Sequence, residues 1–182
     1  MNSIGLVEVK NVSRGVRVTD EMLKSAGIHL LQSGAVCPGK FVSIVGGYLS
    51  SIRAAVDRGA MVAEDALIDS FVIGNLGEKV FEAMCGVVDV KDKKALGIIE
   101  TFTAATAILA ADAAVKAAVI QLIEVRIARG MGGKCFVTLT GNVADVRAAV
   151  EAGAVIAERE GVLINKEVIA NPHPDLWQAV MQ

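Results

Sequence analysis

The segment GAVCPGKF, residues 34–41, contains the side chain with the clearest chemical potential in this sequence, the thiol of Cys37. A cysteine thiolate can act as a nucleophile or as a metal ligand. A Pro-Gly pair follows directly, which is typical of an exposed turn. The other two cysteines differ from it. We expect Cys85 to pack on the apolar face of a helix and Cys135 on one face of a strand, both as small hydrophobic side chains.

Two other chemical uses of this segment are disfavoured. A nucleophilic cysteine needs a general base such as histidine, and the chain has only His29 and His173. His29 stands among apolar residues of a predicted strand, so we expect it to be packed or at an interface. The segment also matches the GxxxxGK start of a phosphate-binding loop, but Phe41 replaces the Ser or Thr that would bind magnesium. The sequence therefore favours neither an enzyme nor a nucleotide-binding protein.

The composition predicts a protein that buries much of its surface against other copies. Hydrophobic residues make up 53% of the 182 residues, whereas aromatic residues make up 4%. The charge-free runs are shorter than the roughly 20 apolar residues of a membrane-spanning helix. A small monomer has little interior in which to hide so much apolar surface, so we expect an obligate oligomer. The net charge of −2, without a basic cluster, argues against nucleic acid as a partner.

The chain is an internal repeat, with copies at residues 1–90 and 91–182. Matching segments follow one another in the same order in both copies: IGLVEV (4–9) and LGIIET (96–101), DEMLKSAGIHLL (20–31) and DAAVKAAVIQLI (112–123), IRAAVDRGAMVAE (52–64) and VRAAVEAGAVIAE (146–158), VIGN (72–75) and VIAN (168–171). The charged stretch DVKDKKA, 89–95, separates them. Such self-similarity indicates one folding unit used twice.

Each copy is predicted to fold as β-α-β-β-α-β-α, an α/β unit of the α+β type in which helices cover a sheet. The predicted strands are 4–11, 29–36, 40–47 and 66–74 in the first copy, and 95–103, 119–128, 134–141 and 161–170 in the second. Ala-rich helices are predicted at 50–64 and 143–160. We expect Thr19 to cap the first helix of copy one and Asn142 to cap the long helix of copy two.

Several of these segments resemble the bacterial microcompartment (BMC) shell-protein domain. The segments that carry the resemblance are IGLVEV, DxMLKSA at 20–26, CPGK at 37–40, VGG at 45–47, RAAV at 53–56 and VIxxPH at 168–173. The resemblance covers both copies and hence nearly the whole chain. The tandem arrangement is most similar to trimeric, pseudohexameric shell proteins of the propanediol-utilisation type that bind an iron–sulfur cluster.

The resemblance implies a homotrimer that tiles with other shell proteins, in the cytoplasm, into a microcompartment shell around enzymes. It implies no catalytic activity. The turn between the second and third strands would line a central pore, with Ala35, Val36, Cys37, Pro38 and Gly39 from copy one and Gly130, Met131, Gly132 and Gly133 from copy two. The implied tile-edge residues are Lys24, Lys116, Asn171 and His173. Asn171 stands where the family commonly has arginine, and copy one lacks the Pro-His pair.

The resemblance also implies one 4Fe–4S cluster per trimer, shared at the threefold axis, with Cys37 of each subunit as the metal ligand. A cubane cluster itself has a threefold axis, so three symmetric thiolates can bind three of its irons. Copy two has no cysteine in its GMGG turn. The implied role is electron transfer or cluster passage across the shell, with an encapsulated redox enzyme as a further partner. The alternatives are a tile with an open metabolite-conducting pore and no cluster, or a ligand-sensing α/β domain.

Overall fold

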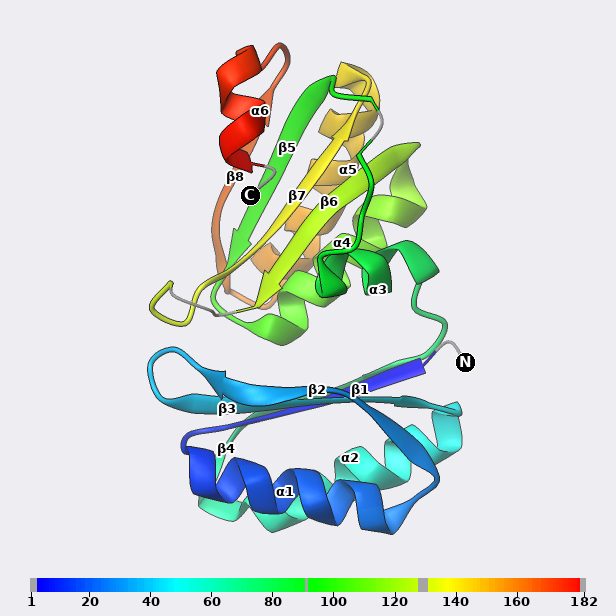
Figure 1. Cartoon of the computed structure of the whole chain (residues 1–182), viewed down its shortest axis with the longest axis vertical. Coiled ribbons are helices and arrows are strands. Elements are labelled where there is room, and N and C mark those ends of the chain that lie inside the picture. Colours follow the sequence, from blue (N-terminus) through cyan, green and yellow to red (C-terminus); the bar gives the residue numbers. More distant parts are fainter. Residues whose placement is uncertain (1–2, 91, 128–130, 181–182) are drawn as a thin grey trace. The chain divides into compact units, whose positions relative to one another are not determined.

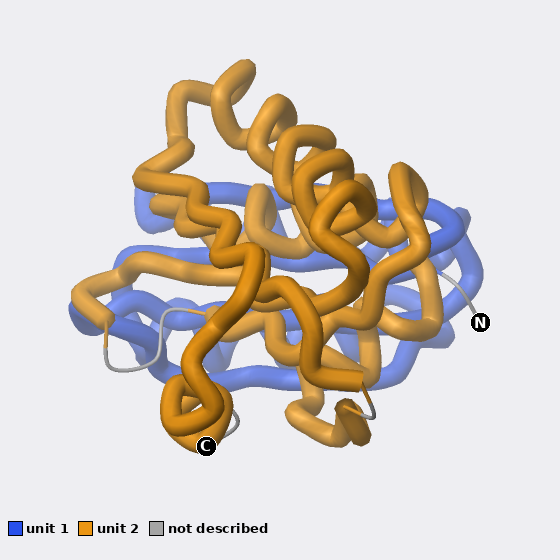
Figure 2. Tube along the Cα trace, turned by 90° about the horizontal axis from the view of Figure 1, so that it is seen from above, with its two compact units in different colours: residues 1–76 blue, residues 77–182 orange. Residues whose placement is uncertain are grey.

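The computed structural model of the chain describes residues 3–90, 92–127 and 131–180 (Figure 1). Its strands form two separate four-stranded antiparallel sheets, each accompanied by helices. The chain divides into two compact units, of which the first ends at Leu76 and the second begins at Gly77 (Figure 2). The two-copy α+β architecture predicted from the sequence is therefore confirmed.

The first unit contains one sheet, in the strand order β2-β3-β1-β4, with two helices on one face (Figure 1). Its elements are β1 (Ser3–Val9), α1 (Val12–Ser25), β2 (Ile28–Val36), β3 (Lys40–Gly47), α2 (Leu49–Ala63), a 3-10 turn (Glu64–Ala66) and β4 (Leu67–Ile73). Val18 and Met22 of α1 pack with Ile52 and Val56 of α2 in the buried core. Alternation along β1 aims Val7 at the same cluster, which joins the helices to the sheet.

The second unit repeats this arrangement, with the strand order β6-β7-β5-β8. Its elements are α3 (Glu78–Cys85), β5 (Ala95–Thr101), α4 (Ala104–Ala117), β6 (Ile120–Ile127), β7 (Cys135–Gly141), α5 (Val143–Arg159), β8 (Leu163–Ile169) and α6 (Pro174–Val180). Helices α4 and α5 cover one face of the sheet (Figure 1). A further apolar cluster joins Trp177 of α6 to Leu96 and Ile123 of the strands.

The segment that connects the two sequence copies packs with the second unit. The sequence places the boundary at 89–95, but the compact units divide before α3. Helix α3 packs against β6 and α4, and its Val80 and Ala83 are fully buried. Val90 joins the cluster around Trp177. Residues 77–90 thus belong to the first copy in sequence and to the second unit in space.

The start of α1 differs from the prediction that Thr19 caps it. Asn11 is the N-cap, and its Oδ1 accepts a hydrogen bond from the backbone N–H of Arg14 at 3.1 Å. Thr19 lies inside the helix, where its hydroxyl donates to the carbonyl of Gly15 at 2.9 Å. Asn142 does directly precede α5, as predicted, although its side chain makes no capping hydrogen bond. The first prediction was wrong because Asn11 offers a cap two turns earlier.

Both units use a glycine where a helix lies close against the central strand. A Cβ atom added to Gly5 in β1 would stand 2.4 Å from Cγ2 of Val56 in α2. At the corresponding Gly97 in β5, the added atom would stand 2.6 Å from Cγ2 of Val150 in α5. These distances are far below van der Waals contact. The repeat thus extends from sequence to the packing of helix on sheet.

Gly5→Ala tests this close approach, with Gly34→Ala as the matched control. Both glycines lie in strands of the first sheet, but no atom lies within 4 Å of a Cβ added at Gly34. We expect Gly5→Ala to lower the free energy of unfolding by about 1–3 kcal/mol, because the helix must shift to admit the methyl group. Gly34→Ala should change it by less than about 0.5 kcal/mol. Urea unfolding followed by circular dichroism measures both, and equal effects would contradict the packing described.

Candidate functional site

Cys37 stands at the tip of the β2–β3 hairpin. The N–H of Gly39 donates to the carbonyl of Val36 at 3.0 Å, which closes the turn over residues 37–39. Gly39 has φ of 90°, a conformation that favours glycine. The Cys37 side chain is half-buried, and Pro38 and Gly39 are exposed. The structure therefore places the thiol on an accessible turn, as the sequence predicted.

The remaining pore-lining residues predicted in copy one flank this turn. Ala35 is exposed, whereas Val36 is 6% exposed and packs into the unit. In copy two, the β6–β7 hairpin forms the corresponding turn. There the N–H of Lys134 donates to the carbonyl of Met131 at 3.2 Å. Gly132 and Gly133 have φ of 63° and 92°. Gly130, also predicted to line the pore, lies outside the described residues.

The two turns hold the same place in their units but differ in length and in chemistry. The shared lysine after each turn, Lys40 and Lys134, aligns Gly39 with Gly133 and Cys37 with Met131. Gly39 and Gly133 have nearly the same positive φ, but seven residues separate the paired Ile127 and Cys135, against five between Ala35 and Phe41. The thioether of methionine cannot ionise to a thiolate. Each chain therefore brings one strong thiolate ligand to a hairpin tip.

An ion pair fixes the base of the first hairpin. Nζ of Lys40, the first residue of β3, lies 2.9 Å from Oε1 of Glu8 in the neighbouring strand β1. The Glu8 side chain is 3% exposed, and its Oε2 has no hydrogen-bond partner among the described residues. A buried carboxylate needs a compensating charge. The lysine after the turn is thereby held against the sheet, which sets the position of the tip above it.

The two predicted tile-edge lysines have different surroundings. Lys24 in α1 pairs with Asp20 at 2.5 Å, and its side chain is 69% exposed. The hydrogen bond and charge of Asp20 raise the pKa of Lys24 above its usual value. Lys116 in α4 pairs with the corresponding Asp112, which is 7% exposed. Oδ1 of Asp112 also accepts a hydrogen bond from the N–H of Gly77 at 3.2 Å, so this pair fixes the segment that enters α3.

Asp112→Ala and Asp20→Ala form a matched pair that tests this difference. We expect Asp112→Ala to cost about 1–3 kcal/mol of unfolding free energy, because it leaves the N–H of Gly77 without an acceptor. Asp20→Ala removes an exposed ion pair and should cost less than about 1 kcal/mol. Hydrogen exchange should also become faster in α3 of the Asp112 variant alone. Unchanged exchange in α3 would show that Asp112 does not hold this segment.

The other predicted edge residues, Asn171 and His173, lie between β8 and α6. Both are exposed, and Nδ1 of His173 accepts a hydrogen bond from the N–H of Asp175 at 3.3 Å. Asn171 lines a cavity of about 220 Å³ together with Lys93 and Lys94. The sequence alone did not indicate that these lysines lie beside Asn171. They bring two positive charges beside Asn171.

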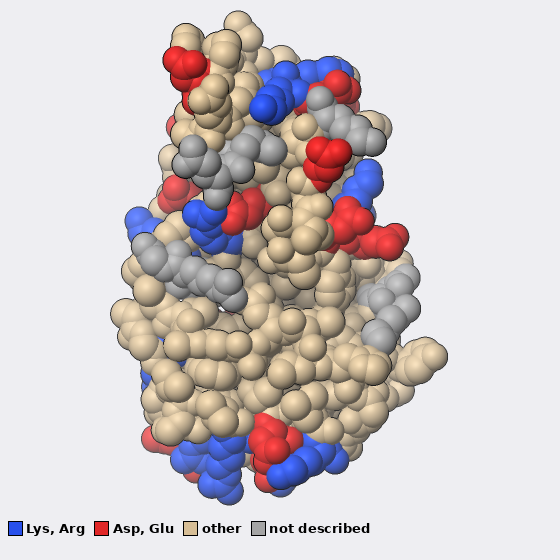
Figure 3. All heavy atoms as spheres, viewed as in Figure 1, with Lys and Arg blue, Asp and Glu red and all other residues tan. Residues whose placement is uncertain are grey.

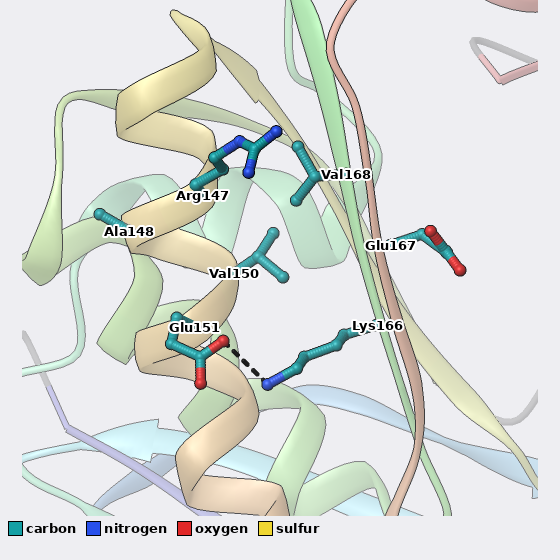
Figure 4. A pocket seen from close by; sticks show the side chains of 7 residues that line it. All are labelled: Arg147, Ala148, Val150, Glu151, Lys166, Glu167 and Val168. Carbon is teal, nitrogen blue, oxygen red and sulfur yellow. Dashed lines mark hydrogen bonds and ion pairs between the residues drawn. The ribbon is translucent and has the colours of Figure 1, made fainter.

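A larger hollow of about 510 Å³ lies between α5 and β8 (Figure 4). Nζ of Lys166 reaches across it to Oε2 of Glu151 at 2.8 Å and also contacts Oε1 of Glu158 at 3.1 Å. These carboxylates, Glu151 first, raise the pKa of Lys166. The first copy has Ser70 at the corresponding position. From the sequence, this cluster could have been recognised only from a lysine in an edge strand, Lys166, and two glutamates about two turns apart on one helix, Glu151 and Glu158.

The other two cysteines are not candidates for the metal site. Cys135 is fully buried, as predicted. The prediction for Cys85 was wrong, because this residue is exposed at the end of α3 and Val80 and Ala83 form the buried side of that helix. Among the described residues, no group of three or more His, Cys, Asp or Glu side chains could hold a metal ion. Since each chain offers one thiol at the turn, a cluster on Cys37 would require thiolates from other chains.

Comparison with known proteins identifies the family. The profile of the BMC domain matches residues 3–76 and again residues 95–172. The chain therefore belongs to the BMC-domain family and is a shell protein of bacterial microcompartments with two such domains in tandem. Over 180 residues it is 38% identical to the bacterial microcompartment shell protein PduT of Citrobacter freundii, covering 99% of this chain and 98% of that one. The similarity to PduT thus extends over nearly the full length of both chains.

Solved structures support the same assignment. A crystal structure of a microcompartment protein from Desulfitobacterium hafniense DCB matches with a TM-score of 0.92 and 43% identity, covering 98% of this chain and 99% of that chain. The fused permuted hexameric shell protein MSM0275 shares the fold, with a TM-score of 0.61 and 23% identity over 86% of this chain and 81% of its own.

A shorter relative matches one of the two units. The shell protein EutM of Salmonella typhimurium is 45% identical over 83 residues, which are 46% of this chain and 84% of EutM. EutM thus matches about half of this chain, which agrees with one folding unit used twice. No helix in the described part of the chain is long and apolar enough to cross a membrane.

Proposed function

We propose that three copies of this chain form a pseudohexameric shell tile whose central pore holds one 4Fe–4S cluster, bound by Cys37 of each subunit. The tile would pass electrons across the shell or deliver the cluster to enzymes inside. The observation that carries this proposal is the place of Cys37, a half-exposed thiol on a hairpin tip. The turn of the second copy, residues 128–134, has no cysteine in its sequence, which limits a trimer to three such thiols.

The number and type of donors fit a cluster shared between chains. Iron–sulfur clusters are normally held by several cysteine thiolates, and one chain supplies one at this site. Three symmetric thiolates match the threefold axis of the cubane. The fourth iron would then lie on the axis with a ligand other than cysteine. When bound, such a cluster accepts and returns single electrons.

The residues around Cys37 are compatible with metal binding at this turn. Pro38 and Gly39 are small and exposed, so they leave the thiol accessible from the tip. The Lys40–Glu8 ion pair at 2.9 Å holds the base of the hairpin in place. A ligand turn benefits from such support, because ordered neighbours keep donor atoms in position when the metal is absent.

The proposed partners follow from the family. Other shell proteins would meet the tile at its edges, near Lys24, Lys116, Asn171 and His173. An encapsulated redox enzyme would exchange electrons with the cluster from inside the compartment. The similar proteins PduT and EutM are shell proteins, and we propose that this chain likewise has a structural role without catalytic turnover.

Iron content with Cys37→Ser, compared with Cys85→Ser, tests the cluster. Both cysteines are accessible to solvent at least in part, but only Cys37 lies on a hairpin tip. After anaerobic reconstitution, we expect wild-type protein and Cys85→Ser to be brown and to contain about four iron and four sulfide per three chains. Cys37→Ser should lose most of this iron and the visible absorption. Mass analysis should show that the Cys37→Ser protein still assembles.

Two results would contradict the proposed cluster. Colourless wild-type trimers, or equal iron in wild type and Cys37→Ser, would exclude the shared cluster. Trimers that bind no iron but admit small polar metabolites would favour the open-pore alternative. The small exposed residues Ala35, Gly39 and Gly132 are compatible with such a pore.

A further inference from the structure

The hairpin that carries Cys37 has a single formal charge. Between Lys24 and Arg53, Lys40 is the only Lys, Arg, Asp or Glu residue of the sequence. It directly follows the turn, and its Cα pairs across the hairpin with that of Val36. On the face that Figure 3 draws, the charged side chains of the first unit gather over its helices, and the surface over its strands is almost uncharged. The charge of Lys40 is therefore the one that the hairpin itself brings to the turn.

The structure compensates this charge with Glu8. Oε1 of Glu8 lies 2.9 Å from Nζ of Lys40, and the two side chains are 3% and 25% exposed. The strand register places Glu8 opposite Val42 of β3, so the ion pair runs diagonally between neighbouring strands on one face of the sheet. Salt screens a buried pair much less than an exposed one. Each subunit thus carries a neutral pair where Lys40 alone would leave a positive charge.

The second copy has the same two residue types but no such pair. Glu100 and Lys134 hold the positions of Glu8 and Lys40 in the sequence repeat and in the strand register. Glu100 is half-buried and Lys134 is exposed, and within the described part of the chain no ion pair joins them. The turn before Lys134 has no cysteine in its sequence. The lysine that follows the turn is therefore neutralised only in the copy that carries the thiol.

The fold does not require this pair. The second unit forms the same four-stranded sheet with Glu100 and Lys134 unpaired. A buried carboxylate is costly to remove from water, and Oε2 of Glu8 has no hydrogen-bond partner among the described residues. A buried ion pair adds little net stability for this reason. A function at the adjoining turn accounts for a pair that the fold itself can omit.

We propose that Glu8 is a positioning residue for the cluster, because it holds Lys40 in a neutral pair beside the Cys37 turn and so keeps the reduction potential low. Net charge around an iron–sulfur cluster is one of the factors that set its potential. A nearby positive charge stabilises the reduced, more negative form, so unpaired lysines would raise the potential. Three subunits would bring three of them. Glu8 acts through Lys40 and is itself no ligand.

This inference rests on the cluster proposed above. It adds what residues outside the ligand turn do to the cluster, namely that they set the potential at which it accepts an electron. Its test therefore measures that potential, because a merely structural role of Glu8 would not move the potential in a direction that follows the charge.

Glu8→Gln, with Glu100→Gln as its control, tests the charge of Lys40. Glutamine keeps the size of the side chain and leaves Lys40 unpaired. In a mediated reductive titration followed by visible absorption and electron paramagnetic resonance, we expect Glu8→Gln to shift the midpoint potential to less negative values. Glu100→Gln should shift it much less, because Glu100 is more open to solvent and neutralises no lysine beside a thiol. Iron analysis should show equal iron per three chains in the proteins compared.

The double variant Glu8→Gln/Lys40→Met separates charge from structure. It removes both members of the pair, so the net charge beside the turn returns to that of the wild type. We expect its midpoint potential to lie close to the wild-type value, below that of Glu8→Gln. If Glu8 only supported the fold, the second substitution would add to the disturbance and would not reverse the shift. Circular dichroism spectra should be alike for the wild type and all variants.

The outcomes distinguish the role of Glu8 from the cluster itself. Iron-loaded Glu8→Gln protein with the wild-type potential overturns the role of Glu8 and leaves the cluster proposal standing. A shift that Glu100→Gln matches, or that the double variant does not reverse, does the same. Loss of iron from both Glu8→Gln and the double variant would show a structural role alone and also overturns the inference. Wild-type protein that binds no iron overturns both proposals.

Discussion

The burial of apolar surface on both sides of small four-stranded sheets is the constraint on which this structure depends. Paired helices cover one face of each sheet, and Gly5 and Gly97 let them approach closely. The parts of each sheet that these paired helices do not cover must be buried as well. In the second unit α3 and α6 contribute to this, through Val80, Ala83 and Trp177. The aromatic-poor, apolar composition reflects this need, because thin layers of Ala, Val and Ile fill it better than bulky rings.

The placement of function follows from the same arrangement. Hairpins extend from the sheets, so their tips are not required for the core and can vary in chemistry. Cys37 and Met131 lie in the hairpin turns of the two units, and each turn ends in a glycine with φ near 90°. The surroundings of the predicted tile-edge lysines also differ between the two copies. Lys24 remains on an exposed pair, while Lys116 belongs to a pair that also holds the entry to α3.

The sequence predicted the repeat, the order of elements and the exposed turn at Cys37, because these depend on local patterns. It did not predict that residues 77–90 pack with the second unit, since this depends on tertiary contacts of α3 that leave no local signal. Cys85 was misplaced for a related reason, because the buried side of its helix is set by those same contacts. Thr19 looked like a cap because the predicted helix began too late, whereas Asn11 lies directly before the first turn of α1.

The difference between Cys37 and Met131 has a consequence for stoichiometry. If the two kinds of hairpin tip stood on separate single-domain chains, random co-assembly would give a statistical mixture of rings with varying numbers of thiols. Covalent fusion removes this variation, because every chain brings one tip of each kind. The ratio of thiol-bearing to thiol-free positions is then fixed by the chain itself and does not depend on how much protein the cell makes.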